Sequence, residues 1–79
     1  MNNRETYDSL FMECLDLSEA ALGPDLVYQS VEMWDSVGHM QLIAALEDAF
    51  DIMLDTDDII DFSSYEIGMG ILKKYEVEL

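Results

Sequence analysis

The chain has 79 residues, of which 18 are acidic and three are basic, giving a formal net charge of −15 at pH 7. Because so negative a surface repels nucleic-acid phosphates and anionic lipid, it argues against nucleic-acid binding and membrane-surface roles. The hydrophobic fraction of 51% is enough for one compact core, and we expect a single domain spanning residues 1–79.

The charge exceeds what solubility requires, since a net charge of magnitude about 2–8 suffices for a small domain. The excess favours steering toward basic patches on partner proteins. No run of about 18 apolar residues could span a membrane, and the first residues lack the apolar segment of a secretory signal. We expect a monomeric cytoplasmic protein that does not insert into membranes.

The first element predicted is an amphipathic helix over residues 3–17. Asn2 and Glu5 have the spacing of a capping box. The only cysteine, Cys14, is expected to be a buried small hydrophobe, and it cannot form an internal disulfide. The apolar residues at helical spacing are Tyr7, Leu10, Phe11, Cys14 and Leu15.

Residues 18–34 show no long periodic element and contain the turn signal Gly23-Pro24. A connection this long in so short a chain is typically functional or contains short helical turns. We expect Trp34 to pin the end of this loop to the core; the alternative is a stacking platform for a cofactor.

A second helix is predicted from Asp35 and Ser36, which are helix-starting residue types, to Phe50. Five apolar residues recur at the spacing of one helical face, and Leu42 and Leu46 form a second row. The five are Val37, Met40, Ile43, Ala44 and Phe50.

Two further helices are predicted after a short linker. Thr56 has the character of an N-cap for a helix of one to two turns, with Asp57 and Asp58 in its first turn. Ser63 and Glu66 have the spacing of a capping box for the last helix.

The last helix is expected to place Ile67, Ile71, Leu72 and Tyr75 on one face. Lys73 and Lys74 fall in its last turn, where cations suit the helix dipole. Gly68 and Gly70 weaken the helix but would permit close helix contact. The elements together predict an all-α fold, a small four-helix bundle of three principal helices and one short helix, with a long loop between the first two helices.

Metal and catalytic sites are poorly supported. The acids of residues 55–66 partly fit a calcium-loop register, but Ile59 takes a ligand position and Ile60 the glycine position. One cysteine and one histidine cannot supply four zinc ligands. His39 lies three residues after Ser36, yet there is no Gly-x-Ser-x-Gly elbow. We expect His39 to be exposed or at the rim of its helix, no metal site, and a protein that is not an enzyme.

Ser36 is the candidate functional residue, and two interpretations of it are open. It is either only an N-cap or the attachment point of a phosphate-linked arm. A phosphodiester at a helix N-terminus is favoured by the free amides and the helix dipole, and a helix entrance after a long loop is accessible to modifying enzymes. We therefore predict a covalently attached arm on Ser36.

Over nearly its whole length the chain resembles the acyl carrier proteins, small acidic four-helix carriers. Asp35-Ser36-Val37 matches their Asp-Ser-Leu attachment motif, with valine in place of leucine. The resemblance implies that Ser36 takes 4′-phosphopantetheine from coenzyme A through a phosphopantetheinyl transferase, and that Asp35 assists recognition by that transferase. It also implies docking of the second helix onto basic patches of partner enzymes, through Val37, Met40, Gln41, Glu47 and Asp48.

The resemblance implies carriage without chemistry by the protein itself. The thiol of the arm would hold acyl intermediates as thioesters and deliver them to enzymes of fatty-acid, polyketide or a related specialised pathway. Gly38 and Gln41 stand where acidic residues are common, which favours a dedicated set of partners. Two alternatives stay open: an aminoacyl or peptidyl carrier, and an acidic adaptor protein without a prosthetic group.

Overall fold

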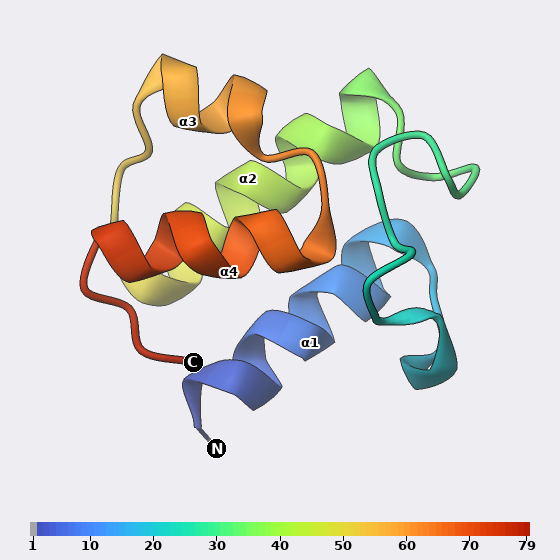
Figure 1. Ribbon diagram of the computed structural model, residues 1–79, viewed down its shortest axis with the longest axis horizontal. Helices are drawn as coiled ribbons and strands as arrows, with labels where there is room; N and C mark the ends of the chain where they lie inside the picture. The colour runs from blue at the N-terminus through green and yellow to red at the C-terminus, as the bar shows by residue number, and fades with distance from the viewer. Residues whose placement is uncertain (1) are drawn as a thin grey trace.

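The computed structural model describes residues 2–79. That part of the chain contains four α-helices and one short 3₁₀ turn (Figure 1). The helices are α1 (Asn3–Leu15), α2 (Ser36–Phe50), α3 (Thr56–Asp61) and α4 (Tyr65–Lys74), and the 3₁₀ turn is Glu19–Ala21. Within residues 2–79 there is no strand, only an isolated bridge between Val27 and Ser64, so the prediction of an all-α fold is confirmed.

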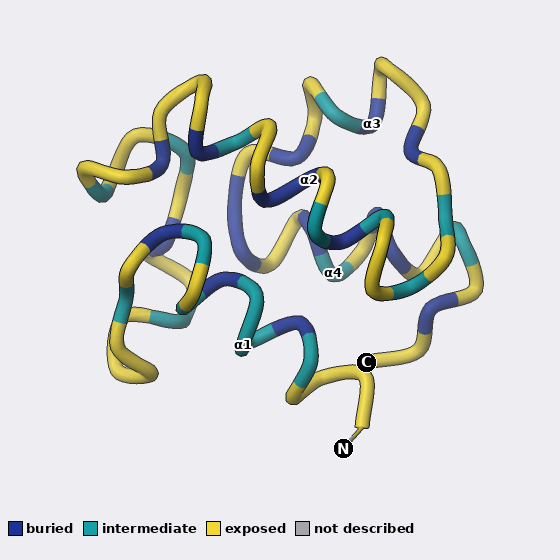
Figure 2. The backbone as a smooth tube through the Cα atoms, turned by 180° about the vertical axis from the view of Figure 1, so that it is seen from behind, coloured by how far each residue is buried: buried dark blue, intermediate teal, exposed yellow. Residues whose placement is uncertain are grey.

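Two helices lie between two others. Both backbone views show α1 and α3 at opposite sides of the molecule, with α2 and α4 between them and the long loop at one end (Figures 1 and 2). The buried residues follow the inward sides of α1, α2 and α4, while much of the loop is exposed (Figure 2). No helix in the described part of the chain is long and apolar enough to cross a membrane.

The core is centred on the ring of Phe11 in α1. Four aromatic rings lie with their centroids 4.9–6.2 Å from it, and they come from α1 itself, the loop, the α3–α4 connection and α4: those of Tyr7, Trp34, Phe62 and Tyr65. Trp34 has no exposed surface, which confirms that it pins the end of the loop to the core. Because Trp34 lies two residues before Ser36, the core fixes the approach to α2.

Helices α1 and α2 end in the same way. Asp16 and Asp51 both adopt the left-handed conformation, with φ of 54°. The amide of Leu17 donates to the carbonyl of Met12 at 3.0 Å, a pattern that closes a helix C-terminus and usually uses glycine. The first helix therefore ends at Leu15 and not at residue 17, while its expected N-cap is confirmed, since Asn2 Oδ1 accepts from the amide of Glu5 at 2.8 Å.

The starts of α3 and α4 differ by one residue from the predictions. Asp55, not Thr56, is the N-cap of α3, and it makes no side-chain capping bond. Ser64, not Ser63, caps α4, because its Oγ accepts from the amide of Ile67 at 2.9 Å. The expected capping box is wrong for this reason.

The packed face of α4 also differs from the prediction. Ile67 is 48% exposed, and the buried residues are Tyr65, Gly68, Ile71 and Leu72. A Cβ atom on Gly68 would lie 2.3 Å from Cζ of Phe62, whereas one on Gly70 would meet nothing within 4 Å. The prediction of a close contact is therefore confirmed at Gly68 and wrong at Gly70.

Candidate functional site

Ser36 is the first residue of α2, and its neighbour Asp35 is the N-cap. The Asp35 carboxylate accepts a hydrogen bond from the amide of Gly38 at 2.8 Å. Ser36 itself is exposed, and no hydrogen bond found among residues 2–79 uses its hydroxyl. The interpretation of Ser36 as an N-cap is therefore wrong. Since Asp35 caps the helix, the Ser36 hydroxyl is accessible at the N-terminus of a 15-residue helix.

The first turn of α2 is pressed against the loop at Gly38. This glycine is buried, and a Cβ atom on it would lie 1.9 Å from the carbonyl oxygen of Met33. Only glycine fits so close to a backbone carbonyl without a shift of the chain. Gly38 therefore allows the loop to pack directly against the helix that carries Ser36.

His39 connects three parts of the chain. Nε1 of Trp34 donates to Nδ1 of His39 at 3.0 Å, and Nε2 of His39 lies 2.8 Å from the carbonyl oxygen of Ile59 in α3. His39 is half-buried, and its ring stacks on that of Trp34 with the two planes 16° apart. His39 is therefore not fully exposed; it lies half-buried at the rim of its helix, and both ring nitrogens have partners inside the fold.

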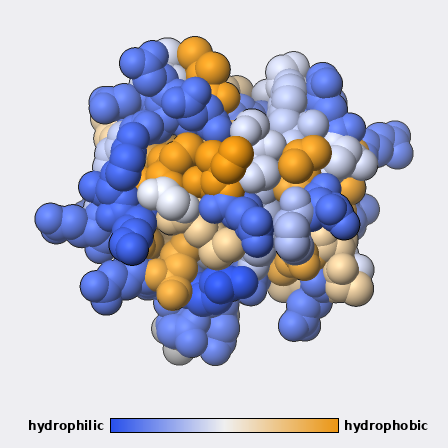
Figure 3. All heavy atoms as spheres, in the orientation of Figure 1, coloured by the Kyte–Doolittle hydropathy of each residue, from blue (hydrophilic) through white to orange (hydrophobic). Residues whose placement is uncertain are grey.

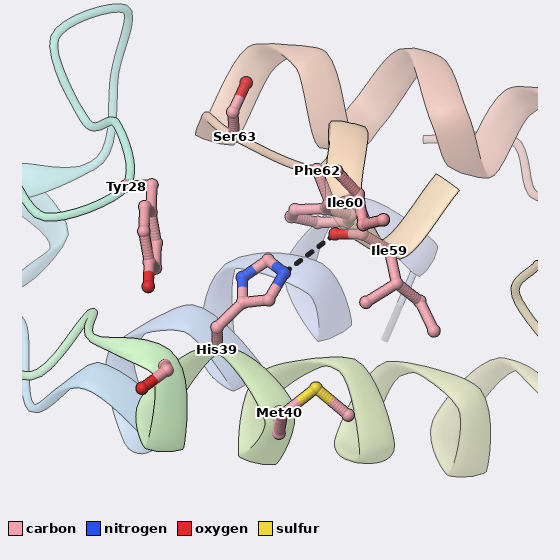
Figure 4. Close-up of a pocket in the computed structure, with 8 residues that line it drawn as sticks. Tyr28, His39, Met40, Ile59, Ile60, Phe62 and Ser63 are labelled. Atoms are coloured by element: carbon pink, nitrogen blue, oxygen red, sulfur yellow. Dashed lines mark hydrogen bonds between the residues drawn. The ribbon is translucent and has the colours of Figure 1, made fainter. Parts of the chain in front are cut away.

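A pocket of about 310 Å³ lies between α2, α3 and the loop, and Ser36 is one of its lining residues (Figure 4). In Figure 4, Met40 approaches from α2 and Ile59 and Ile60 from α3, while Tyr28 comes from the loop. The lining is mainly apolar and consists of Tyr28, Ser36, His39, Met40, Ile59, Ile60, Phe62 and Ser63. A pocket of this character has room for a small apolar group.

Sequence reasoning missed most of this lining. Tyr28, Ile59, Ile60 and Ser63 come from three separate segments, and their convergence depends on the tertiary fold. One local signal was present: the adjacent pair Ile59-Ile60 in an otherwise acidic short helix. A helix of six residues buries one face, and Ile60 is left 71% exposed at the pocket.

The residues predicted to face partners divide into two groups. Val37 and Met40 are 64% and 54% exposed, and Gln41 and Asp48 are also exposed. Glu47 is half-buried, and its Oε2 accepts from the amide of Leu54 at 2.9 Å, so part of its role is structural.

The exposure of the residues along α2 also corrects the apolar face that was expected for this helix. Val37, Met40 and Ala44 lie on the exposed side. The core-facing residues of α2 are Gly38, Leu42, Ile43 and Leu46. The helix therefore carries apolar residues on both sides, and the outward set is exposed.

The remaining candidate residues have no site of their own. Cys14 is half-buried, and this burial raises the pKa of its thiol above the usual range. In the chain from residue 2 onward, no three His, Cys, Asp or Glu side chains group closely enough to hold a metal ion. Asp58, which belongs to the segment compared with a calcium loop, is instead paired with Lys74.

The surface that carries α3 and α4 is mostly hydrophilic, with small hydrophobic areas set among polar side chains (Figure 3). No protein-family model matches the sequence, and no curated protein matches it at a significant level. Function must therefore be inferred from the residues and geometry around Ser36.

Proposed function

We propose that the protein is a carrier of acyl groups, with a 4′-phosphopantetheine arm joined to Ser36 through a phosphodiester. The observation that carries this proposal is the exposed, unbonded hydroxyl of Ser36 at the start of α2, beside an apolar pocket that it helps to line. In this proposal the four helices form a carrier bundle whose long loop and second helix present the serine.

The residues present fit the arm. The Ser36 hydroxyl is not engaged by capping, because Asp35 performs that role. The first amides of an α-helix have no intrahelical acceptor, so they and the helix dipole favour a phosphate at this position. The arm would supply a terminal thiol that holds acyl groups as thioesters.

The pocket favours an acyl cargo. Met40, Ile59, Ile60 and Phe62 offer an apolar lining to a chain attached through Ser36. A charged aminoacyl group would lose its hydration there without gaining a counter-charge. The alternative of an aminoacyl carrier is less well supported for this reason.

Partner docking follows from charge and exposure. A net charge of −15 attracts enzymes with basic patches, including the transferase that would modify Ser36. Val37 and Met40 add exposed apolar surface next to the serine. Tethered cargo then meets each partner's active site at a raised effective concentration.

The test is the intact mass after incubation with coenzyme A, Mg²⁺ and a broad-specificity phosphopantetheinyl transferase. Wild type and Ser63→Ala should each gain one phosphopantetheinyl group, whereas Ser36→Ala should gain none. Ser63→Ala is the matched control because Ser63 is a second exposed serine of the same pocket.

Two results would contradict the proposal. One is modification of Ser36→Ala, which would move the attachment point elsewhere. The other is no mass gain on a wild-type chain whose far-ultraviolet circular dichroism shows a folded helical protein. The second result would favour an acidic adaptor that uses the exposed side of α2 without a prosthetic group.

A further inference from the structure

The two ring nitrogens of His39 face partners of opposite kinds. The indole N–H of Trp34 can only donate, and it points at Nδ1 from 3.0 Å. The carbonyl oxygen of Ile59 can only accept, and it lies 2.8 Å from Nε2 (Figure 4). Both bonds form together in one state alone: a neutral ring with its proton on Nε2. The geometry therefore matches one tautomer of the neutral ring.

This bridge holds the chain on both sides of Ser36. Trp34 precedes the serine by two residues, and its own backbone is fixed in the loop, because its carbonyl accepts from Gln29 and its amide donates to Val31. His39 follows the serine by three residues and reaches across to α3. The loop, α2 and α3 are thus joined by polar bonds through one imidazole.

Two of the nearest neighbours of the His39 ring are aromatic. Tyr28 from the loop and Phe62 from the α3–α4 connection contact it edge-on, with centroid distances of 5.5 and 6.2 Å. Among the described residues no carboxylate lies within ion-pair distance of His39. On α2, the Asp35 carboxylate is bonded to the amide of Gly38, and on α3, Asp58 is bonded to Lys74.

We propose that His39 is a positioning residue for Ser36 and makes modification of Ser36 depend on the protonation state of its ring. The inference rests on the proposed attachment at Ser36. A proton added to Nδ1 would face the N–H of Trp34, so two donors would oppose each other and the bond would be lost. Trp34 has no exposed surface, so its N–H would then be buried without an acceptor, which is costly. The loop end that presents Ser36 would then be held less firmly.

The chain is well suited to a direct test, because it has one tryptophan and one histidine. Trp34 fluorescence is followed from pH 8 to pH 5, the interval in which histidine side chains change charge. Wild type should show a transition to red-shifted, quenched emission. His39→Gln should show none, because an amide offers one acceptor and one donor but takes up no proton in this range. The His39→Gln substitution leaves every carboxylate in place, so the titration of the carboxylates is common to both proteins.

A second measurement needs no variant. Nitrogen-15 spectra of the wild-type imidazole at pH 8 should show the proton on Nε2 and a bare Nδ1. The opposite tautomer, or the same pH response of fluorescence in wild type and His39→Gln, would overturn the proposal.

The link to Ser36 is measured by the rate of phosphopantetheinyl transfer at pH 8 and pH 5.5. For each protein we take the rate at pH 5.5 divided by the rate at pH 8. This quotient should be about three- to tenfold lower for wild type than for His39→Gln, the effect expected for one buried hydrogen bond. The dependence of the transferase on pH is common to both proteins and cancels in this comparison. Equal ratios would overturn the positioning role. If neither protein is modified at any pH, the proposed function fails, while the fluorescence and the tautomer still decide whether the bridge is proton-dependent.

Discussion

The carboxylate of Asp58 in α3 lies 2.5 Å from the ammonium nitrogen of Lys74 in the last turn of α4. The hydroxyl of Tyr75 donates to the other carboxylate oxygen, also at 2.5 Å, and accepts from the amide of Asp55 at 3.0 Å. A helix of six residues has little stability of its own. This cluster therefore holds α3 against the end of α4. On its other side α3 is held to α2, because His39 contacts the carbonyl oxygen of Ile59.

We expect Asp58→Asn to lower the free energy of unfolding at pH 7. The hydrogen bond from Lys74, and then that from Tyr75, lowers the pKa of Asp58 below its ordinary value. A carboxylate with a lowered pKa stabilises the fold fully above the unfolded-state pKa, about 3.9, and loses that contribution as the pH falls through the folded-state value. The difference between wild type and Asp58→Asn should therefore shrink below pH ~4 in urea unfolding.

The control for this change is Asp57→Asn. It removes the same charge from the same first turn, but Asp57 is exposed, so its loss should leave the urea midpoint almost unchanged. If Asp57→Asn were as destabilising as Asp58→Asn, the effect would come from the net charge or the helix dipole and not from the cluster.

Gly68→Ala should destabilise the protein by about 1–3 kcal/mol, the usual cost of overpacking a core. The new methyl would lie 2.3 Å from Cζ of Phe62 and 2.4 Å from the hydroxyl of Tyr7. That hydroxyl donates to the carbonyl of Tyr65 at 2.7 Å and cannot move without losing a buried bond. The measurement is thermal or urea unfolding.

Gly70→Ala is the matched variant in the same helix, and we expect the opposite sign. Nothing within 4 Å would meet its methyl. Alanine is favoured over glycine in a helix interior by roughly 0.5–1 kcal/mol, so Gly70→Ala should stabilise the protein. Destabilisation by both substitutions to a similar extent would mean that α4 needs flexibility and not clearance at Gly68.

The sequence was sufficient to predict the helices because their apolar residues recur at helical spacing. It was not sufficient for every helix end. The first helix stops at Leu15 because Asp16 takes the left-handed conformation that glycine most often takes, so residue type gave no stop signal there. At the start of α4 two serines were available, and Ser64 is distinguished as the cap by tertiary contacts: the packing of Tyr65 against Phe11 and Tyr7, and the backbone bridge between Val27 and Ser64.

The sequence predicted those features of the candidate site that depend on neighbouring residues, but not those that depend on contacts between distant segments. The position of Ser36 at the mouth of α2 follows from the residues around it. The partners of His39 do not, because they are an indole from the loop and a backbone carbonyl from α3. Likewise spacing alone placed Val37 and Met40 on one helical face with Ile43, because it does not tell which side of an apolar helix the rest of the fold covers. In the structure Ile43 is buried, whereas Val37 and Met40 are exposed.

Asp35 has two roles that substitution can separate. Asparagine caps helices about as well as aspartate, so Asp35→Asn should keep the bond to the Gly38 amide and the stability of wild type. Asp35→Ala should lose about 1 kcal/mol of stability with the cap. If the carboxylate is recognised by the transferase, both variants should be modified slowly. Modification of Asp35→Asn at the wild-type rate, alongside slow modification of Asp35→Ala, would assign the effect to helix capping alone.

Glu47 and Asp48 are neighbouring acids of α2 for which we expect different losses on change to alanine. Glu47→Ala removes the acceptor of the Leu54 amide and should cost about 0.5–1.5 kcal/mol in urea unfolding.

Asp48→Ala should leave stability nearly unchanged, because Asp48 is exposed and no hydrogen bond or ion pair involving its side chain was found among residues 2–79. The substitution should instead slow association with a basic partner, and the association rate constant with the transferase is measured by stopped flow. The rate should drop by about two- to fivefold at low salt, the equivalent of one exposed ion pair. The difference should vanish at high salt, where such pairs are screened. A salt-independent loss for Asp48→Ala, or none at all, would remove Asp48 from the docking surface and leave Val37, Met40 and Gln41 as its candidates.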